Sequence, residues 1–183
     1  HAELGVYELL VVPCANPDGV YQGWTNNGPG RCQLEPGIDM NMDFDYRFKV
    51  RENPCNRTGG VPFSSPEGAA LRDLVLREKP DIIIDFHGWI NSAAGDQAVS
   101  DVFCRDLGLR YDKWEEVVYP GFFIGWAAKH SKAVLVEYPS PYTGQGELGF
   151  RSDKKPDRKV DIGLWGFTDK TIQSLKEIIN TNL

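Results

Sequence analysis

Blocks of apolar and polar residues alternate along this chain and predict strands separated by helices. Continuous apolar runs predict strands at residues 6–12, 81–86 and 133–138. Mixed apolar and polar patterns predict helices at residues 64–80, 100–107, 122–130 and 168–180. Strands buried on both faces that alternate with helices are typical of parallel sheets covered on both sides. We therefore predict an α/β fold with a mixed, largely parallel sheet and helices on both faces.

The first and last of these helices have the clearest patterns. Ser64 and Glu67 match a capping box at the start of the first helix. Pro66 lies in its first turn, and Pro80 ends it. Its apolar face is predicted to comprise Ala70, Leu71, Leu74 and Val75. The inward face of the last helix is predicted to comprise Ile172, Leu175, Ile178 and Ile179.

Length and composition are those of one soluble globular domain spanning residues 1–183. Hydrophobic residues make up 41% of the chain and charged residues 25%. No apolar run approaches the roughly 20 residues that a membrane span needs, and the first residues do not match a signal peptide. The formal net charge is -6 and the basic residues are scattered, which argues against nucleic-acid binding.

The four cysteines form no CxxC pair, so a structural zinc knuckle is not indicated. Cys14 and Cys104 lie in apolar or helical patterns and are predicted to be buried free thiols. Cys32 and Cys55 lie in loops rich in glycine and proline, where a cross-link would indicate an oxidising compartment. Asn56–Thr58 is a glycosylation sequon, which fits secretion. We therefore expect a secreted or extracytoplasmic protein.

Two of the predicted strands end in ionisable side chains. Asp85 and His87 follow one apolar run, and Glu137 follows another. In open α/β sheets, sites form outside the carboxyl ends of the strands, so these side chains would share one crevice if their strands are close. An imidazole beside a carboxylate serves either as an acid–base pair or as a metal ligand with a nearby base. The alternative is a hydrogen-bonded core histidine and a salt-bridged glutamate.

Short motifs also follow one another in a specific order. They are NPDG at 16–19, Arg31, GIDMN at 37–41, PFSSPEGAALRDLV at 62–75, IDFHG at 84–88 and VLVEYP at 134–139. The first three lie in residues 16–60, a segment without sustained periodicity, as in long functional or disordered loops. In this order and spacing the chain resembles the zinc carboxypeptidase family, which includes carboxypeptidase A, over nearly its whole length. The resemblance implies the α/β fold of that family.

The resemblance implies metal-assisted hydrolysis of an amide bond at or near the carboxyl end of a peptide. His87 matches the family's second zinc-binding histidine. Glu137 matches the general base that takes a proton from the zinc-bound water and passes it to the leaving amine. Arg31 matches the arginine that stabilises the tetrahedral oxyanion. Zinc and a peptide substrate are thus the expected cofactor and partner.

Three further positions match residues that hold the substrate in the family. Asn41 matches the asparagine on the substrate's terminal carboxylate, and Tyr119 matches a mobile tyrosine over the bound substrate. Ile124 matches the base of the pocket for the terminal side chain, which would favour apolar or aromatic residues; the alternative is that Ile124 belongs to the core. Cys32 and Cys55 lie near two cysteines that some members bridge, so a disulfide between them is expected.

The chain departs from the family pattern at two places. The family's first zinc motif, a histidine and a glutamate with two residues between them, lies upstream of NPDG. His1 and Glu3 have the wrong spacing to replace it, so the chain is expected to be an N-terminally incomplete piece of the family fold. Met42 stands where the family has the arginine that clamps the substrate carboxylate. Arg47 or Arg51 would have to substitute for that arginine.

These observations support three interpretations. The leading one is a zinc carboxypeptidase-type enzyme whose isolated 183-residue chain binds zinc poorly. The second is a catalytically inactive carboxypeptidase-like module that binds peptide or cell-wall fragments. The third is a hydrolase with another substrate, such as an amide of an acidic small molecule or a peptidoglycan stem peptide. The sequence does not predict the oligomeric state.

Overall fold

The computed structural model describes residues 7–17, 24–25, 28–29, 37–53, 56–88, 90–138, 164–181 and 183. Its helices are η1 (Met40–Met42), α2 (Pro66–Glu78), α3 (Gln97–Leu107), α4 (Trp114–Val117), α5 (Phe123–Ala127) and α6 (Leu164–Thr181). Its strands are β1 (Trp24–Thr25), β2 (Gly28–Pro29), β3 (Ile82–Gly88), β4 (Ser92–Gly95), β5 (Arg110–Tyr111) and β6 (Lys132–Tyr138). None of the helices in these ranges has the length and hydropathy required to cross a membrane.

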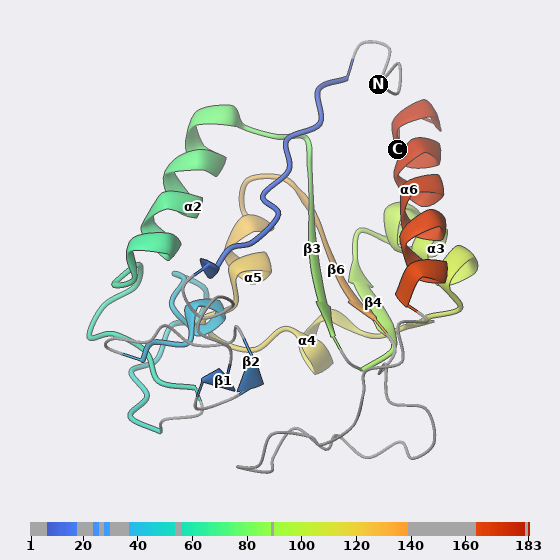
Figure 1. The fold of residues 1–183 in the computed structure, drawn as a ribbon. Coiled ribbons are helices and arrows are strands. Elements are labelled where there is room, and N and C mark those ends of the chain that lie inside the picture. Colours follow the sequence, from blue (N-terminus) through green and yellow to red (C-terminus); the bar gives the residue numbers. More distant parts are fainter. Residues whose placement is uncertain are drawn as a thin grey trace.

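Four strands form one mixed sheet in the order β3–β6–β4–β5 (Figure 1). β3 and β6 run parallel, β4 runs antiparallel to β6, and β5 runs parallel to β4. The predicted mixed α/β sheet is therefore confirmed. The sequence did not predict β4, because its residues, SAAG, include no β-branched or aromatic side chain. β1 and β2 form a separate antiparallel pair.

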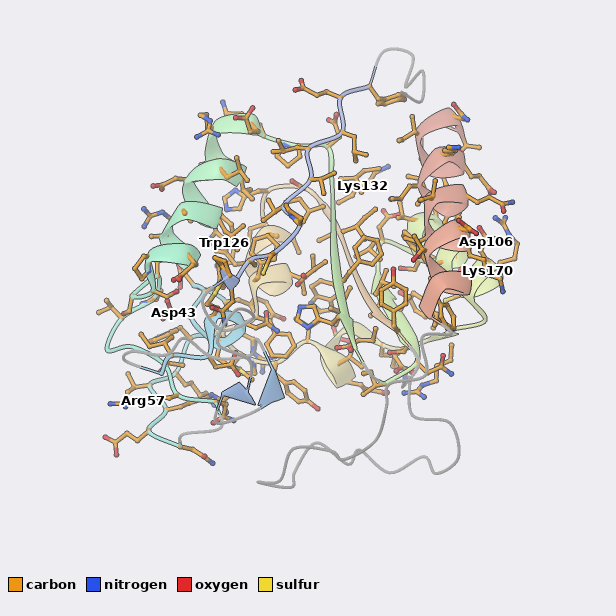
Figure 2. All side chains as sticks on the ribbon, viewed as in Figure 1. Asp43, Arg57, Asp106, Trp126, Lys132 and Lys170 are labelled. Atoms are coloured by element: carbon orange, nitrogen blue, oxygen red, sulfur yellow. The ribbon has the colours of Figure 1, made fainter. Side chains whose placement is uncertain are left out.

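Helices cover both faces of this sheet, as predicted. Ala133 and Leu135 of β6 belong to a core cluster shared with α2 and α5. Val134 and Val136 belong to a second cluster, shared with α3 and α6, because successive strand residues point to opposite faces. Figure 1 shows α2 and α5 on one side of β3 and β6, and α3 and α6 on the other. Figure 2 places Trp126 of α5 accordingly, on the α2 side.

Two strand predictions need correction. Residues 7–12 form no strand in the described chain, and the apolar side chains of 9–12 are exposed. An apolar run becomes a strand only when a neighbour accepts its backbone hydrogen bonds, and no described strand pairs with this one. β3 lies at an edge of the sheet, with half-buried isoleucines and with Phe86 40% exposed. Its predicted burial on both faces is therefore wrong for the described chain.

The start of α2 differs by one residue from the predicted capping box. Ser65 is the N-cap, because its hydroxyl accepts the backbone N–H of Gly68 at 3.1 Å. Ser64 instead donates its hydroxyl to the backbone carbonyl of Val61. On the predicted apolar face, Val75 is buried, whereas Ala70 is exposed. The predicted helix is confirmed, and only its cap and part of its inner face change.

α6 packs against α3 through polar as well as apolar side chains. Ile178 is buried, as predicted, but Ile172 is exposed, so the inward face is rotated from the predicted one. Ser174 is fully buried and donates its hydroxyl to Asp106 of α3 at 2.7 Å. A buried hydroxyl needs such a partner. The apolar pattern alone could not place this serine at the contact between the two helices.

The cysteine predictions hold in part. Cys14 and Cys104 are both free, as predicted. Cys14 is exposed rather than buried, because no strand of the described residues pairs with the segment that carries it. Cys104 is half-buried on α3. Cys32 and Cys55 lie outside the described residues, so their bridge stays a prediction.

Candidate active site

The parallel pairing of β3 with β6 brings the predicted histidine and glutamate together. His87 is the register partner of Glu137, so both side chains leave the sheet on the same face, near its carboxyl edge. Nδ1 of His87 lies 4.0 Å from Oε1 of Glu137, which is beyond the length of a hydrogen bond. The predicted placement of these two residues on one face of neighbouring strands is confirmed.

Asp85 adds a second carboxylate beside the histidine. It lies two residues before His87 on β3 and therefore on the same face. Its Oδ2 is 3.1 Å from Nε2 of His87, within hydrogen-bond length when that nitrogen carries a proton. A carboxylate on one ring nitrogen orients an imidazole and frees the other nitrogen for a different partner. Here the other nitrogen is Nδ1, which faces Glu137.

The carboxylates change the acidity of His87. Burial by itself lowers the pKa of an imidazole. The negative charges of Asp85, Glu137 and Asp39 outweigh burial and raise the pKa of His87 to about 9. Glu137 is itself only 9% exposed. The site therefore combines the imidazole of His87 with the carboxylates of Asp85 and Glu137 on this face of the sheet, and the charge of Asp39 acts on the same imidazole.

η1 holds Asn41 against the start of α5. Asp39 caps η1, because its Oδ1 accepts the backbone N–H of Asn41 at 3.2 Å. The side-chain oxygen of Asn41 accepts the backbone N–H of Phe123, at the start of α5, at 3.1 Å. This bond orients the amide so that its nitrogen remains a hydrogen-bond donor. The capping role of Asp39 was not predicted from the sequence, although an aspartate before a helical turn is an N-cap signal.

Backbone hydrogen bonds join the segment after Asn41 to the loop before α5. The N–H of Phe44 donates to the carbonyl of Gly121 at 2.9 Å, and the N–H of Gly121 donates to the carbonyl of Tyr46 at 2.7 Å. Gly121 has a φ of 95°, and a Cβ at this position would collide with the carbonyl of Met42. Only glycine allows both this backbone conformation and this close approach.

Replacing Gly121 with alanine is expected to lower the free energy of unfolding by about 1–3 kcal/mol, because the backbone would be strained. Urea unfolding measures this loss. Gly60→Ala is the control, because a Cβ at Gly60 meets no atom within 4 Å; its effect should stay within about 0.5 kcal/mol. Equal stabilities for the two variants would contradict the packing of Gly121 against Met42.

The structure separates the three residues predicted to bind substrate. Asn41 is half-buried beside α5, whereas Tyr119 is 53% exposed, with its ring 5.5 Å from that of Phe122. Ile124 is fully buried in the core cluster of α2 and α5. This burial fits the alternative of a core residue, and the predicted contact with a substrate side chain stays a prediction. Met42 is buried in the same cluster, so position 42 also belongs to the core.

The other residues considered from the sequence do not join this group in the described chain. Arg31 lies outside the described residues. Arg47 is exposed and Arg51 is half-buried. His130, the last residue of the predicted helix 122–130, lies after α5, and its ring lies 4.7 Å from that of Trp126. The imidazole of the candidate site is therefore that of His87.

A zinc ion would find only part of its ligand set among these residues. His87 has the surroundings of a metal ligand, since a carboxylate holds one of its ring nitrogens. A catalytic zinc takes about three protein ligands and a water. The ranges that the structure describes contain no group of three or more His, Cys, Asp or Glu side chains that could hold a metal ion. This part of the chain does not complete a zinc site by itself.

Comparison with known sequences assigns the family. Residues 4–95 match the family model described as zinc carboxypeptidase, Peptidase_M14, which is half of the chain. The chain belongs to the zinc carboxypeptidase family. The match includes the GIDMN and IDFHG motifs, and therefore Asn41 and His87, whereas Glu137 lies beyond it.

The chain is similar to relatives of different descriptions. It is 35% identical to bacteriocin BCN5 of Clostridium perfringens over 142 residues, which are 73% of the chain and 16% of the bacteriocin. It is 27% identical to the inactive metallocarboxypeptidase ecm14 of Talaromyces stipitatus over 105 residues, 51% of the chain and 18% of that protein. The chain thus spans a minor part of these curated relatives.

The fold is also similar to that of solved structures. Murein-tripeptide amidase MpaA from Escherichia coli O157 superposes with a TM-score of 0.61 at 20% sequence identity. The superposition covers 92% of this chain and 66% of the amidase. At this identity the similarity supports the zinc carboxypeptidase fold and not a particular substrate.

Proposed function

We propose that this chain is part of a zinc-dependent hydrolase that cleaves an amide bond at or near the carboxyl end of a peptide. The observation that carries the proposal is the pairing of His87 with Glu137 on adjacent parallel strands. Membership of the zinc carboxypeptidase family supports a hydrolase of this type.

Glu137 is the proposed general base. Its carboxylate would take a proton from the attacking water and give it to the leaving amine, so that the amine departs neutral. At 9% exposure it is largely shielded from bulk water, which strengthens electrostatic interactions in the site.

His87 is the proposed zinc ligand, through Nδ1. The carboxylate of Asp85 lies 3.1 Å from Nε2 of His87 and would fix the orientation of the ring. Nδ1 would then point away from Asp85. The other ligands would come from outside the described residues, in keeping with a chain that spans 16% of the length of the bacteriocin to which it is similar.

Three residues are proposed to act on the substrate. Arg31 would stabilise the oxyanion, Asn41 would bind the group beyond the scissile amide, and Tyr119 would cover the bound peptide. The exposure of Tyr119 and the oriented amide of Asn41 support the last two roles. An extracytoplasmic location is part of the proposal, with support from the sequon at Asn56–Thr58.

A module that binds peptide or cell-wall fragments without cleaving them is the second candidate. Met42 favours it, because burial of an apolar side chain there removes the charged clamp expected from the resemblance. The similarity to a protein described as an inactive metallocarboxypeptidase favours it as well. The pairing of His87 with Glu137 favours the hydrolase, because peptide binding alone needs neither residue.

Zinc content separates the two candidates. The full-length protein is expected to retain about one zinc after dialysis against metal-free buffer, whereas this 183-residue chain alone should retain much less. Asp85→Asn in the full-length protein should weaken zinc binding by about 10–100-fold, because the ring of His87 loses its anionic partner. Elemental analysis measures the zinc content, and competition with a chelator measures the strength of zinc binding.

His130→Ala is the control for these zinc measurements, because this exposed histidine precedes the start of β6, whereas His87 pairs with Glu137 at the other end of that strand. Its zinc content should equal that of the unchanged protein. A full-length protein without zinc would favour the binding module. One tightly bound zinc in the isolated chain would contradict the incomplete ligand set.

A further inference from the structure

Ser92 begins β4, next to the glutamate of the candidate site. It is the register partner of Glu137, which is in turn the register partner of His87. Opposite residues of an antiparallel pair point to the same face of the sheet, with Cβ atoms about 4.5–5.5 Å apart. The side chains of His87, Glu137 and Ser92 therefore form a row across three neighbouring strands, β3, β6 and β4.

The position of Ser92 is otherwise suited to an apolar residue. Its side chain is fully buried, and the next register pair on the same face, Ala94 with Leu135, belongs to the core cluster shared with α2 and α5. A buried hydroxyl costs free energy unless it has a hydrogen-bond partner. Alanine, as at the next two positions of β4, would avoid this cost. The serine is therefore unfavourable for packing alone.

Two carboxylates flank the hydroxyl of Ser92, because β4 lies between β6 and β5. Glu137 is on the β6 side. Asp112, which follows β5, is on the other side, and its pKa is lowered by Arg110 and, to a smaller extent, by the hydroxyl of Ser92. Asp112 already accepts Nε–H of Arg110 at 2.8 and 3.1 Å. It therefore remains paired when the hydroxyl of Ser92 turns to Glu137.

The hydroxyl is able to make this turn. Among the residues that the structure describes, no group lies in hydrogen-bonding geometry with Oγ of Ser92. Serine has three staggered rotamers and a single hydroxyl proton, so it donates to one of the two carboxylates at a time. An ionised carboxylate in a buried place is a strong acceptor for such a proton.

A general base has to present one oxygen to the attacking water. His87 does not fix the carboxylate of Glu137 by a hydrogen bond, because the two side chains are 4.0 Å apart. The last torsion of a glutamate side chain is broad. A donor that holds one of its oxygens would restrict this torsion and orient the other oxygen.

We propose that Ser92 is a positioning residue for Glu137, because its hydroxyl donates to one carboxylate oxygen and so directs the other at the attacking water. This inference rests on the proposed function, in which Glu137 is the general base, and adds a residue to the same reaction.

The kinetic test uses the zinc-loaded full-length protein and the fastest-cleaved member of a panel of blocked peptides. Ser92→Ala is expected to lower kcat by about 10–100-fold, as expected for a misplaced catalytic group. KM should change little, because the hydroxyl does not contact the substrate. Ser92→Thr keeps the hydroxyl and suits a strand, so it should restore most of the lost kcat.

Ser100→Ala is the matched control. Ser100 is also fully buried, and its hydroxyl likewise makes no hydrogen bond in the described part of the chain. It belongs to α3, which covers the opposite face of the sheet. Its replacement removes the same group and should leave kcat unchanged. An equal fall of kcat in Ser100→Ala, or no recovery in Ser92→Thr, would overturn the inference, because loss of packing would then explain the effect.

A crystal structure of the unchanged full-length protein tests the contact without any turnover. It should place Oγ of Ser92 about 2.5–3.0 Å from an oxygen of Glu137. This distance in a protein that cleaves no peptide would support the contact and contradict the proposed function. A hydroxyl bonded to Asp112 alone, or unchanged kcat in Ser92→Ala, would overturn the inference and leave the proposed function standing.

Discussion

Replacing Glu137 with glutamine is expected to lower kcat of the full-length protein by about 10²–10⁴-fold, the usual contribution of a general base. Glutamine keeps the shape of the side chain but cannot accept the proton of the attacking water. The register pair with His87 and the low exposure of Glu137 are the observations behind this expectation. KM should change much less than kcat, because the variant removes a proton acceptor and not a substrate contact.

Glu116→Gln is the matched control for this variant. Glu116 is an exposed glutamate of α4, and its carboxylate lies 3.9 Å from Nζ of Lys113. Its replacement should leave kcat unchanged, since exposed ion pairs contribute little to structure. Circular dichroism should show that both variants fold alike. Retention of full activity by Glu137→Gln would exclude Glu137 as the base.

Replacing Phe44 with alanine is expected to lower the free energy of unfolding by about 3–5 kcal/mol. Phe44 is 1% exposed, and its ring centroid lies 5.6, 5.0 and 5.9 Å from those of Phe63, Phe123 and Trp126. Alanine would leave a cavity in the centre of this aromatic group. Because the backbone of Phe44 also bonds to Gly121, the segment that carries Asn41 should lose order as well.

Phe86→Ala is the control for this core variant. Phe86 also contacts aromatic rings, those of Phe103 and Tyr138, but it is 40% exposed on the edge strand. Removing a partly exposed ring leaves a smaller cavity, so the loss should be clearly below that for Phe44. Urea unfolding measures the free energy of unfolding of both variants. Equal losses would contradict the central place of Phe44 in the core.

The sequence was sufficient to locate the ends of β3 and β6. Both strands are short apolar runs that stop at ionisable residues, and parallel strands place their carboxyl ends at one edge of a sheet. His87 and Glu137 therefore had to lie near the same edge once their strands paired. The hydrogen bond from His87 to Asp85 follows from the same two-residue spacing on one strand.

The remaining errors come from contacts between residues distant in sequence. Residues 9–12 have the pattern of a strand, yet pattern alone cannot supply the neighbour that a strand needs. β4 has no strand signal, and its pairing with β6 determines its conformation. Ile124 is apolar, which fits a pocket wall as well as a core, and its neighbours in the core cluster could not be predicted from the sequence.

Peptide hydrolysis by the zinc-loaded full-length protein, with and without a chelator, tests the central claim most directly. Release of the new amine from blocked peptides with acid, carboxamide and extended ends would be followed by mass spectrometry. The account predicts cleavage near the carboxyl end that stops with the chelator, returns with zinc and is lost in Glu137→Gln. Absence of cleavage by protein that holds one zinc, or cleavage that persists in Glu137→Gln, would contradict it.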